Sequence, residues 1–196
     1  MKLKNYEFKS DPYQHQLDTL KSSAHRNLFA LFLEMGLGKS KILLDNAGML
    51  FEEGKISGLL IVSPKGNLNN WDSNEISRHL PERIKRNVLV WQPNHTQRWT
   101  KAFKDMVQDD STGVLNIFLV NVEAFATVKA CTHVEEFLVT HDAMMAIDES
   151  TTIKNPKAKR TKHLIKLGPL ADYRRILTGF PITKAPLDLY SQCYFL

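Results

Sequence analysis

A glycine-rich stretch, residues 34–40, carries the residue types that bind a phosphate chain. It reads Glu-Met-Gly-Leu-Gly-Lys-Ser. Gly36 and Gly38 allow the backbone to turn tightly around Leu37 and to point its N–H groups inward at a phosphate. A helix that begins near Gly38 would aim the positive end of its dipole at the same place. We therefore expect these residues to bind a nucleoside triphosphate.

Lys39 and Ser40 complete this phosphate site. The lysine can reach the β- and γ-phosphates, and the serine hydroxyl can ligate Mg²⁺. The general P-loop pattern has another glycine five residues before Gly38, where this chain has Leu33. The alternative is a glycine-rich turn that only caps a helix. The apolar run before the stretch and the amphipathic run after it place the stretch at a strand-to-helix junction, which favours ATP binding.

Two adjacent carboxylates, Asp148 and Glu149, follow the apolar run 143–147. One would hold Mg²⁺, largely through water, because Mg²⁺ keeps several of its waters. The next can orient the attacking water or accept its proton. A solvated acidic pair is the alternative interpretation. We take Lys39, Asp148 and Glu149 as the catalytic candidates, with Ser40 and Asp148 as the metal candidates.

The composition is that of a globular domain. The chain has 196 residues, of which 43% are hydrophobic and 24% charged, and its net charge is +5. This size predicts a single domain covering 1–196, and the mild positive charge permits a polyanionic partner without requiring one. The chain has two cysteines, which do not form a disulfide framework. No apolar run is long enough for a membrane span, so no membrane partner and a cytoplasmic location are expected.

Other residue types could bind a metal or a base, and we prefer a structural interpretation for each. Cys131, His133 and His141 do not match a zinc spacing. The three tryptophans, at 71, 91 and 99, could stack on bases. Each lies within an apolar context, which favours burial.

Apolar runs and helical patterns alternate along the chain. Strands are expected at 28–33, 59–62, 88–91, 114–120, 143–147 and 175–177. Helices are expected from Pro12 (with Asp11 as N-cap), at 39–52, after the break at 63–66 through Trp71, Ile76 and Leu80, and at 95–107, 131–140, 157–167 and 186–196. A turn is expected at 109–113 and a loop at 151–156. This alternation predicts an α/β fold with a mostly parallel central sheet and helices on both faces. The phosphate-binding stretch and the acidic pair would then meet at the carboxyl edge of the sheet.

Several segments together resemble the amino-terminal RecA-like P-loop lobe of superfamily-two helicases, and more closely the remodeller-type (switch/sucrose-non-fermenting) ATPases, including bacterial and phage versions. The resemblance spans nearly the whole chain. Three segments resemble motifs of the first half of the lobe: 15–20 the adenine-reading Q segment, 34–40 the family P-loop, and 60–64 with Asn70-Trp71 motif Ia. Three later segments follow in the family's order: 121–124 resembles the next nucleic-acid-side segment, 148–150 with 153–155 resembles motif II, and 177–182 resembles motif III.

The resemblance implies a role for individual residues. Gln16 would contact the adenine edge, and Gly36, Leu37, Gly38, Lys39 and Ser40 would hold the phosphates of ATP with Mg²⁺. Candidates for contacting DNA, or for coupling it to the ATP site, are Lys65, Asn121, Lys154, Thr178 and Gly179. The implied partners are double-stranded DNA and a second RecA-like lobe, which we expect to lie outside this chain.

The chain also departs from the family pattern. Ser150-Thr151 stands where a small residue and a histidine usually follow the acidic pair, and Phe180 replaces a threonine. The histidine typically couples the ATP site to motif III, so the coupling in this chain is an open question. The lysine-rich run 157–162 could contact DNA phosphates or the second lobe, or form a solvated helix face.

The leading hypothesis is therefore the ATP-binding lobe of a DNA translocase or helicase. Its activity is expected to be weak without the second lobe. The alternative is a nucleotide-dependent binding module without useful turnover. A small-molecule kinase is a remote third hypothesis, because it would leave the resemblance to motifs Ia and III unexplained.

Overall fold

The computed structural model describes residues 6–108 and 113–196. Most of the turn expected at 109–113 therefore lies outside the described residues. Within them the strands form one six-stranded sheet, in the order β1-β6-β5-β2-β4-β3, and every neighbouring pair is parallel. The bounds are β1 Leu28–Phe32, β2 Gly58–Ser63, β3 Arg86–Val90, β4 Leu115–Asn121, β5 Ala143–Asp148 and β6 Tyr173–Thr178. The α/β fold class is confirmed.

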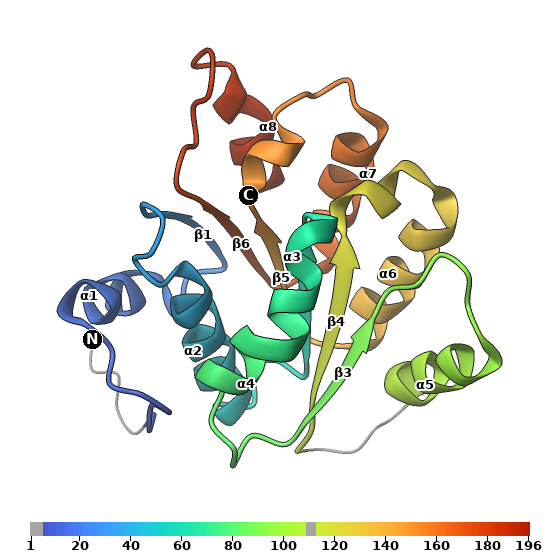
Figure 1. Ribbon diagram of the computed structural model, residues 1–196, viewed down its shortest axis with the longest axis horizontal. Helices are drawn as coiled ribbons and strands as arrows, with labels where there is room; N and C mark the ends of the chain where they lie inside the picture. The colour runs from blue at the N-terminus through green and yellow to red at the C-terminus, as the bar shows by residue number, and fades with distance from the viewer. Residues whose placement is uncertain (1–5, 109–112) are drawn as a thin grey trace.

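Helices connect the strands. Their bounds are α1 Gln14–Ser23, α2 Lys39–Glu52, α3 Lys65–Asn70, α4 Ile76–His79, α5 Gln97–Gln108, α6 Val128–Thr140, α7 Lys159–Leu167 and α8 Asp188–Phe195. Short 3₁₀ turns cover Val122–Ala126, Ser150–Ile153 and Gly168–Leu170, and a π-helical turn, Trp71–Glu75, joins α3 to α4. Figure 1 shows α2, α3 and α4 in front of the sheet. None of the helices that the structure describes is long and apolar enough to cross a membrane.

Two hydrophobic cores lie on opposite faces of the sheet. Along β2, Leu59 and Ile61 belong to one core, whereas Leu60 and Val62 belong to the other. Side chains alternate between the faces of a strand, so a strand covered on both faces must be apolar at every position. Helices α1 to α4 pack on the first face and α5 to α8 on the second. The continuous apolar runs therefore identified the central strands correctly.

The start of α1 differs from the expectation. The helix begins at Gln14 with Tyr13 as its N-cap residue, so the prediction of Asp11 as N-cap was wrong. The capping interaction instead comes from inside the helix, because Gln16 Oε1 accepts the Tyr13 N–H at 3.0 Å. Tyr13 is extended, with φ −65° and ψ 159°, so the helical conformation starts one residue after it.

Two other segments differ from the expectation: one expected helix is interrupted, and one expected loop begins with a helical turn. The helix expected up to Leu80 is interrupted by the π-helical turn. The loop expected at 151–156 begins instead in the 3₁₀ turn Ser150–Ile153, whose backbone bonds Thr152 N–H to Glu149 C=O at 2.9 Å. Both irregular turns lie directly beside the carboxyl edge of the sheet, where the site is built.

Candidate nucleotide-binding site

The glycine-rich stretch forms a tight loop between β1 and α2. Gly36 and Gly38 have φ values of +81° and +80°, which only glycine adopts readily. Gly38 is the N-cap residue of α2, so the first N–H groups of that helix lie beside the loop. The loop geometry therefore presents backbone donors and a positive helix end at one place, as a phosphate site requires.

Gln16 packs against this loop. Its side chain is buried, and its Nε2 donates to the carbonyl of Leu37 at 3.2 Å. A Cβ added at Gly38 would come within 2.3 Å of Gln16 Nε2. The amide thus fixes the loop onto α1, and the contact with adenine remains a prediction.

Lys39 bends back over the loop. Its Nζ donates to the carbonyl oxygens of Leu33 at 3.0 Å and Glu34 at 3.2 Å. These are neutral partners, so a phosphate would be a stronger one for the ammonium group. Lys39 and Ser40 both line the cavity described below.

Asp148 ends β5 with its carboxylate held on both sides. Oδ2 accepts the Ser63 hydroxyl at 2.9 Å and the Trp71 indole N–H at 3.0 Å, while Oδ1 accepts the Glu149 N–H at 3.0 Å. A carboxylate offers about four acceptor positions. Asp148 therefore lines the cavity in a fixed orientation with acceptor capacity left over.

Glu149 follows in a strained conformation. It has φ +46°, the left-handed region that non-glycine residues rarely adopt, and no other non-glycine residue among those described has positive φ. Burial, and then the negative charge of Asp148, raise the pKa of the Glu149 carboxyl, while Lys39 opposes the shift. Strain and a raised pKa are both typical of a residue placed for chemistry.

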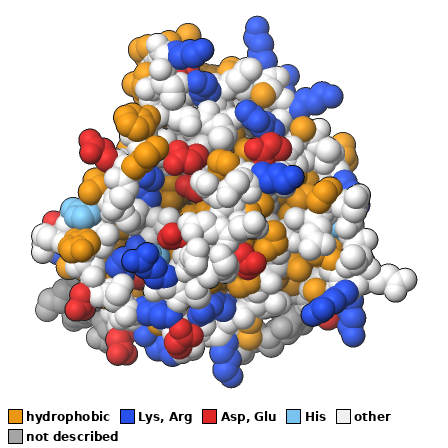
Figure 2. Space-filling model, in the orientation of Figure 1, with side chains coloured by type: hydrophobic (Ala, Val, Ile, Leu, Met, Phe, Trp, Pro, Cys, Tyr) orange, Lys and Arg blue, Asp and Glu red, His pale blue; other side chains and the backbone are white. Residues whose placement is uncertain are grey.

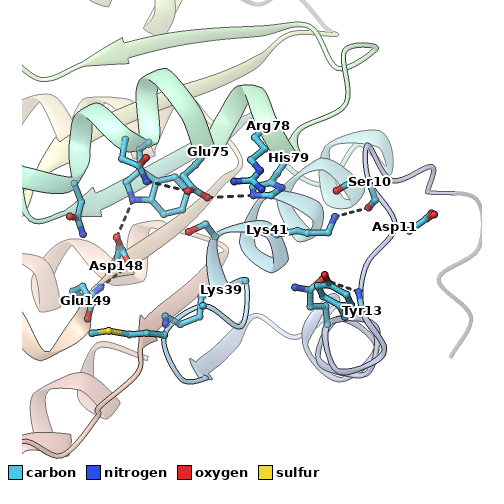
Figure 3. Close-up of a pocket in the computed structure, with 18 residues that line it drawn as sticks. Ser10, Asp11, Tyr13, Lys39, Lys41, Glu75, Arg78, His79, Asp148 and Glu149 are labelled. Atoms are coloured by element: carbon cyan, nitrogen blue, oxygen red, sulfur yellow. Dashed lines mark hydrogen bonds and ion pairs between the residues drawn. The ribbon is translucent and has the colours of Figure 1, made fainter.

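One cavity of about 710 Å³ brings these groups together. Figure 3 shows Lys39 and Glu149 at one end and Ser10, Asp11 and Tyr13 at the other. Of the residues predicted from the sequence to bind nucleotide or metal, those that line it are Gln16, Gly36, Gly38, Lys39, Ser40, Asp148 and Glu149. Leu37 lies in the same loop and contributes its carbonyl to Gln16.

A helical wall of the cavity was not expected from the sequence to line the nucleotide site, although Asn70-Trp71 within it had been matched to motif Ia. It consists of side chains from α3, the π-helical turn and α4: Asn67, Asn70, Trp71, Glu75, Arg78 and His79. Their spacing of three to four residues marks one helix face, and that polar face was the signal available in the sequence. Glu75 pairs with His79 at 3.6 Å, and burial lowers the pKa of His79.

The other side of the cavity is formed by the segment before α1. Ser10, Asp11 and Tyr13 line it, together with Lys41 of α2. Lys41 is buried and donates to the Ser10 carbonyl at 2.8 Å and to Asp45 Oδ2 at 2.9 Å. Burial raises the pKa of Asp45 to about 6, and the Lys41 hydrogen bond opposes that shift.

The candidates for DNA contact or coupling separate into two groups. Thr178 and Gly179 adjoin the site, because Thr178 Oγ1 lies 3.5 Å from Glu149 Oε2 and a Cβ on Gly179 would lie 3.4 Å from the Met35 nitrogen. Lys65, Asn121 and Lys154 do not line the cavity. Lys65 is exposed at the start of α3, Asn121 donates to Glu123 at 3.1 Å, and Lys154 bonds Thr183.

Ser150, the first residue after the acidic pair, has a side-chain partner of its own. Ser150 is fully buried and donates to Gln192 Oε1 at 2.6 Å. Gln192 Nε2 in turn donates to the carbonyl of Pro181 at 2.8 Å. This chain of hydrogen bonds connects the end of β5 to the loop after β6.

Residues interpreted as structural have structural surroundings. All three tryptophans are buried. His141 Nδ1 lies 2.9 Å from the Phe137 carbonyl and its Nε2 lies 3.1 Å from Asn116, while His133 packs against Trp91 and Phe103. Within 6–108 and 113–196, no group of His, Cys, Asp and Glu is arranged to hold a metal by itself.

A nucleotide-bound Mg²⁺ fits the donors that are present. Mg²⁺ takes oxygen ligands, usually one or two from the protein together with waters and substrate phosphates. Ser40 and Asp148 supply a hydroxyl and a carboxylate to the same cavity. The remaining ligands would come from phosphate and water, so two protein oxygens are sufficient.

The comparisons with known proteins agree on one family. Residues 15–196 match the SNF2-related domain. The chain is 28% identical over 188 residues to the ISWI chromatin-remodeling complex ATPase ISW1 of Saccharomyces cerevisiae, and 30% identical over 188 residues to helicase SWR1 of Cryptococcus neoformans. Each match covers 94% of this chain but only 15% and 14% of the relative, so the chain spans about a seventh of those proteins.

Solved structures share the fold. The SWI2/SNF2 ATPase core domain of Sulfolobus solfataricus superposes with a TM-score of 0.72 at 25% identity, covering 99% of this chain and 36% of that one. The same core solved in complex with double-stranded DNA gives a TM-score of 0.76 at 24% identity, covering 100% of this chain and 38% of that one.

Proposed function

Because the chain belongs to the SNF2-related domain family, we propose that it is the ATP-binding lobe of a DNA-dependent ATPase that moves along duplex DNA. One observation carries the proposal. The loop that presents Lys39 and Ser40 faces Asp148 and Glu149 across a single cavity. This arrangement pairs a phosphate cradle with a carboxylate able to act on water, which is what ATP hydrolysis requires.

We assign the reaction steps to residues of this chain. Lys39 would leave the carbonyls of Leu33 and Glu34 to bind the β- and γ-phosphates. Glu149 would orient the attacking water and accept its proton. Mg²⁺, held by Ser40 and through water by Asp148, would neutralise charge on the phosphates. Gln16 would contact the adenine edge while it holds the loop.

DNA and a second RecA-like lobe are the partners in this proposal. The Sulfolobus core was solved with double-stranded DNA, and the relatives are named remodelling ATPases and helicases. Phosphate transfer also needs positive charge around the γ-phosphate, and an arginine supplied from outside is worth about 10³- to 10⁵-fold in rate in related chemistry. We therefore expect slow hydrolysis by this lobe alone and faster hydrolysis when the second lobe is added.

The test is ATP hydrolysis by this chain together with its second lobe, measured with and without duplex DNA. Lys39→Ala and Glu149→Gln serve as the two site controls. Strong stimulation by DNA that both substitutions abolish would support the motor. Intact binding of ATP with Mg²⁺ but no turnover with any nucleic acid would contradict it and would leave the nucleotide-dependent binding module.

A further inference from the structure

We propose that Trp71 is a positioning residue for Asp148: its indole N–H holds the carboxylate in the orientation that receives the nucleotide-bound Mg²⁺. The inference rests on the proposed function, since it assumes that the cavity takes a nucleotide with Mg²⁺. Asp148 itself was expected from the sequence. Trp71 was expected to be buried and was matched, with Asn70, to the motif Ia segment, but no role at the nucleotide site was assigned to it.

The contact between Trp71 and Asp148 is direct and buried. Trp71 Nε1 donates to Asp148 Oδ2 at 3.0 Å, and the tryptophan is only 2% exposed. Ser63 donates to the same oxygen at 2.9 Å from the end of β2. Two neutral donors on Oδ2 and a backbone donor on Oδ1 stop the carboxylate from rotating. A carboxylate that is already oriented loses little entropy when a hydrated cation arrives.

The backbone around Trp71 is adapted to this contact. Trp71 is the first residue of the π-helical turn, and its carbonyl accepts the N–H of Ile76, five residues later. Such a turn inserts one residue into a helix and is frequent at functional sites. Here it lies between α3 and α4, and residues before, within and after it line the cavity: Asn70, Trp71, Glu75 and Arg78. The wall thus delivers an indole donor to the end of β5.

Trp99 provides a matched comparison within the same chain. It is also buried, and its Nε1 also donates a hydrogen bond, but to the backbone carbonyl of Val90 at 2.8 Å. Trp99 lies in the core on the opposite face of the sheet and does not line the cavity. Replacing either tryptophan by phenylalanine removes an indole N–H and part of a buried ring. Only the change at 71 takes a donor from the metal carboxylate.

The experiment measures how nucleotide affinity depends on free Mg²⁺. A fluorescent ATP analogue that resists hydrolysis is titrated onto wild type, Trp71→Phe, Trp99→Phe and Ser63→Ala, both in EDTA and over a series of Mg²⁺ concentrations. Loss of an outer partner of a metal ligand typically costs about 10- to 100-fold in metal affinity. We expect Trp71→Phe to raise the Mg²⁺ concentration for half-maximal binding at least about tenfold. Ser63→Ala should shift it in the same direction, and Trp99→Phe should not.

Nucleotide affinity in EDTA distinguishes a role of Trp71 in positioning Asp148 from a general effect of the substitution on the shape of the cavity. Without Mg²⁺ the nucleotide depends on the P-loop, so Trp71→Phe should bind it as wild type does. Equal losses with and without Mg²⁺, or a Mg²⁺ midpoint that matches Trp99→Phe, would overturn the inference. Failure of the wild type to bind nucleotide at all would instead overturn the proposed function, and this inference with it.

A second measurement does not depend on the folding of a tryptophan variant. The chain has three tryptophans, so its ¹H–¹⁵N spectrum contains three indole signals. Asp148→Asn keeps the size of the side chain but removes its charge, so it should move the Trp71 indole signal and leave that of Trp99 in place. Addition of the ATP analogue with Mg²⁺ should also move the Trp71 signal. A Trp71 signal that responds to neither change would contradict the inference.

Discussion

At the scale of single residues, the two carboxylates at the end of β5 have different surroundings. Asp148 is held by three donors, from Ser63, Trp71 and Glu149. Glu149 is strained, and among the described residues its carboxylate accepts a side-chain hydrogen bond from the Thr178 hydroxyl alone, at 3.5 Å. A fixed carboxylate suits a cation, and one with a raised pKa suits proton transfer. Adjacent residues of similar chemistry therefore fit different tasks.

The first prediction concerns the pH dependence of hydrolysis. Glu149 must be ionised to accept a proton, and its pKa is raised, so kcat should increase with pH through a range above that of an ordinary glutamate. Thr178→Val removes a hydroxyl that lowers this pKa, so the acid limb of the profile should move to higher pH. Thr100→Val, on the exposed surface of α5, should leave the limb unchanged. Glu149→Gln should reduce kcat by about 10²- to 10⁴-fold.

The second prediction uses the two glycines at the ends of α2. Gly38 and Gly54 both have positive φ, so alanine at either position strains the backbone by about 1 to 2 kcal/mol. Only at Gly38 does the new Cβ meet a neighbour, Gln16 Nε2 at 2.3 Å, whereas nothing lies within 4 Å at Gly54. Gly38→Ala should displace the loop and lower kcat about 10²-fold, while Gly54→Ala should only reduce thermal stability. Equal kcat in the two variants would contradict the role of the loop.

At the scale of elements, a buried arginine joins α1 and α2 to the sheet. Arg175 of β6 is fully buried, and burial lowers the pKa of its guanidinium to about 10, so it remains charged at neutral pH. It donates to Asn46 Oδ1 of α2 at 3.1 Å and to the Ser23 carbonyl of α1 at 3.1 Å. The same side chain reaches the carbonyl of Asn27 before β1 at 3.1 Å. Arg175 thus fastens α1 at the end away from Gln16, and α2 near its middle.

The third prediction tests this junction. Arg175→Ala takes from Asn46 Oδ1 the only side-chain donor that the described residues give it, whereas the Ser23 and Asn27 carbonyls keep the N–H groups of Arg26 and Arg174. A stranded buried acceptor costs about 1 to 3 kcal/mol. We expect the free energy of unfolding to fall by about 1 to 3 kcal/mol, measured by urea denaturation. Arg26→Ala, at an exposed position beside the same corner, should change it by less than about 0.5 kcal/mol. Similar losses for the two variants would show that the buried hydrogen bonds are unimportant.

At the scale of the whole molecule, positive charge is spread over the surface. Figure 2 shows Lys and Arg side chains projecting from the upper part of the visible face and others across its lower part. Helix α7 begins soon after β5 ends, and its lysines at 159 and 162 are exposed. These two lysines therefore lie in the connection from the carboxyl end of β5 to β6, at the start of α7.

The fourth prediction concerns duplex DNA. If α7 faces the phosphates, changing Lys159 and Lys162 to alanine should weaken binding on all sequences. It should also reduce the slope of log affinity against log salt by about 1 for each DNA phosphate that these lysines neutralise. The same change at Lys101 and Lys104, exposed on α5, should leave the slope as in wild type. Fluorescence anisotropy over a salt series measures both. An unchanged slope in the α7 variant would assign its lysines to a solvated face.

The sequence by itself determined the features that depend on neighbours along the chain. Strands buried on both faces are apolar at consecutive positions, so β2 and β5 were visible as runs. The phosphate loop is local too, because a few adjacent residues set its glycine conformations, its lysine and the helix start. The α/β fold, the loop and the acidic pair could therefore be predicted.

Only the tertiary structure decided how distant segments complete the site. The hydrogen bond from Trp71 to Asp148 joins residues 77 positions apart, and that from Gln16 to Leu37 joins residues 21 apart. The π-helical turn that aims Trp71 at β5 has no distinct pattern in the sequence, and the cap of α1 came from Gln16 rather than from Asp11. Such contacts depend on how the helices pack on the sheet. Local spacing shows which residues can do chemistry, and packing selects the partners that orient them.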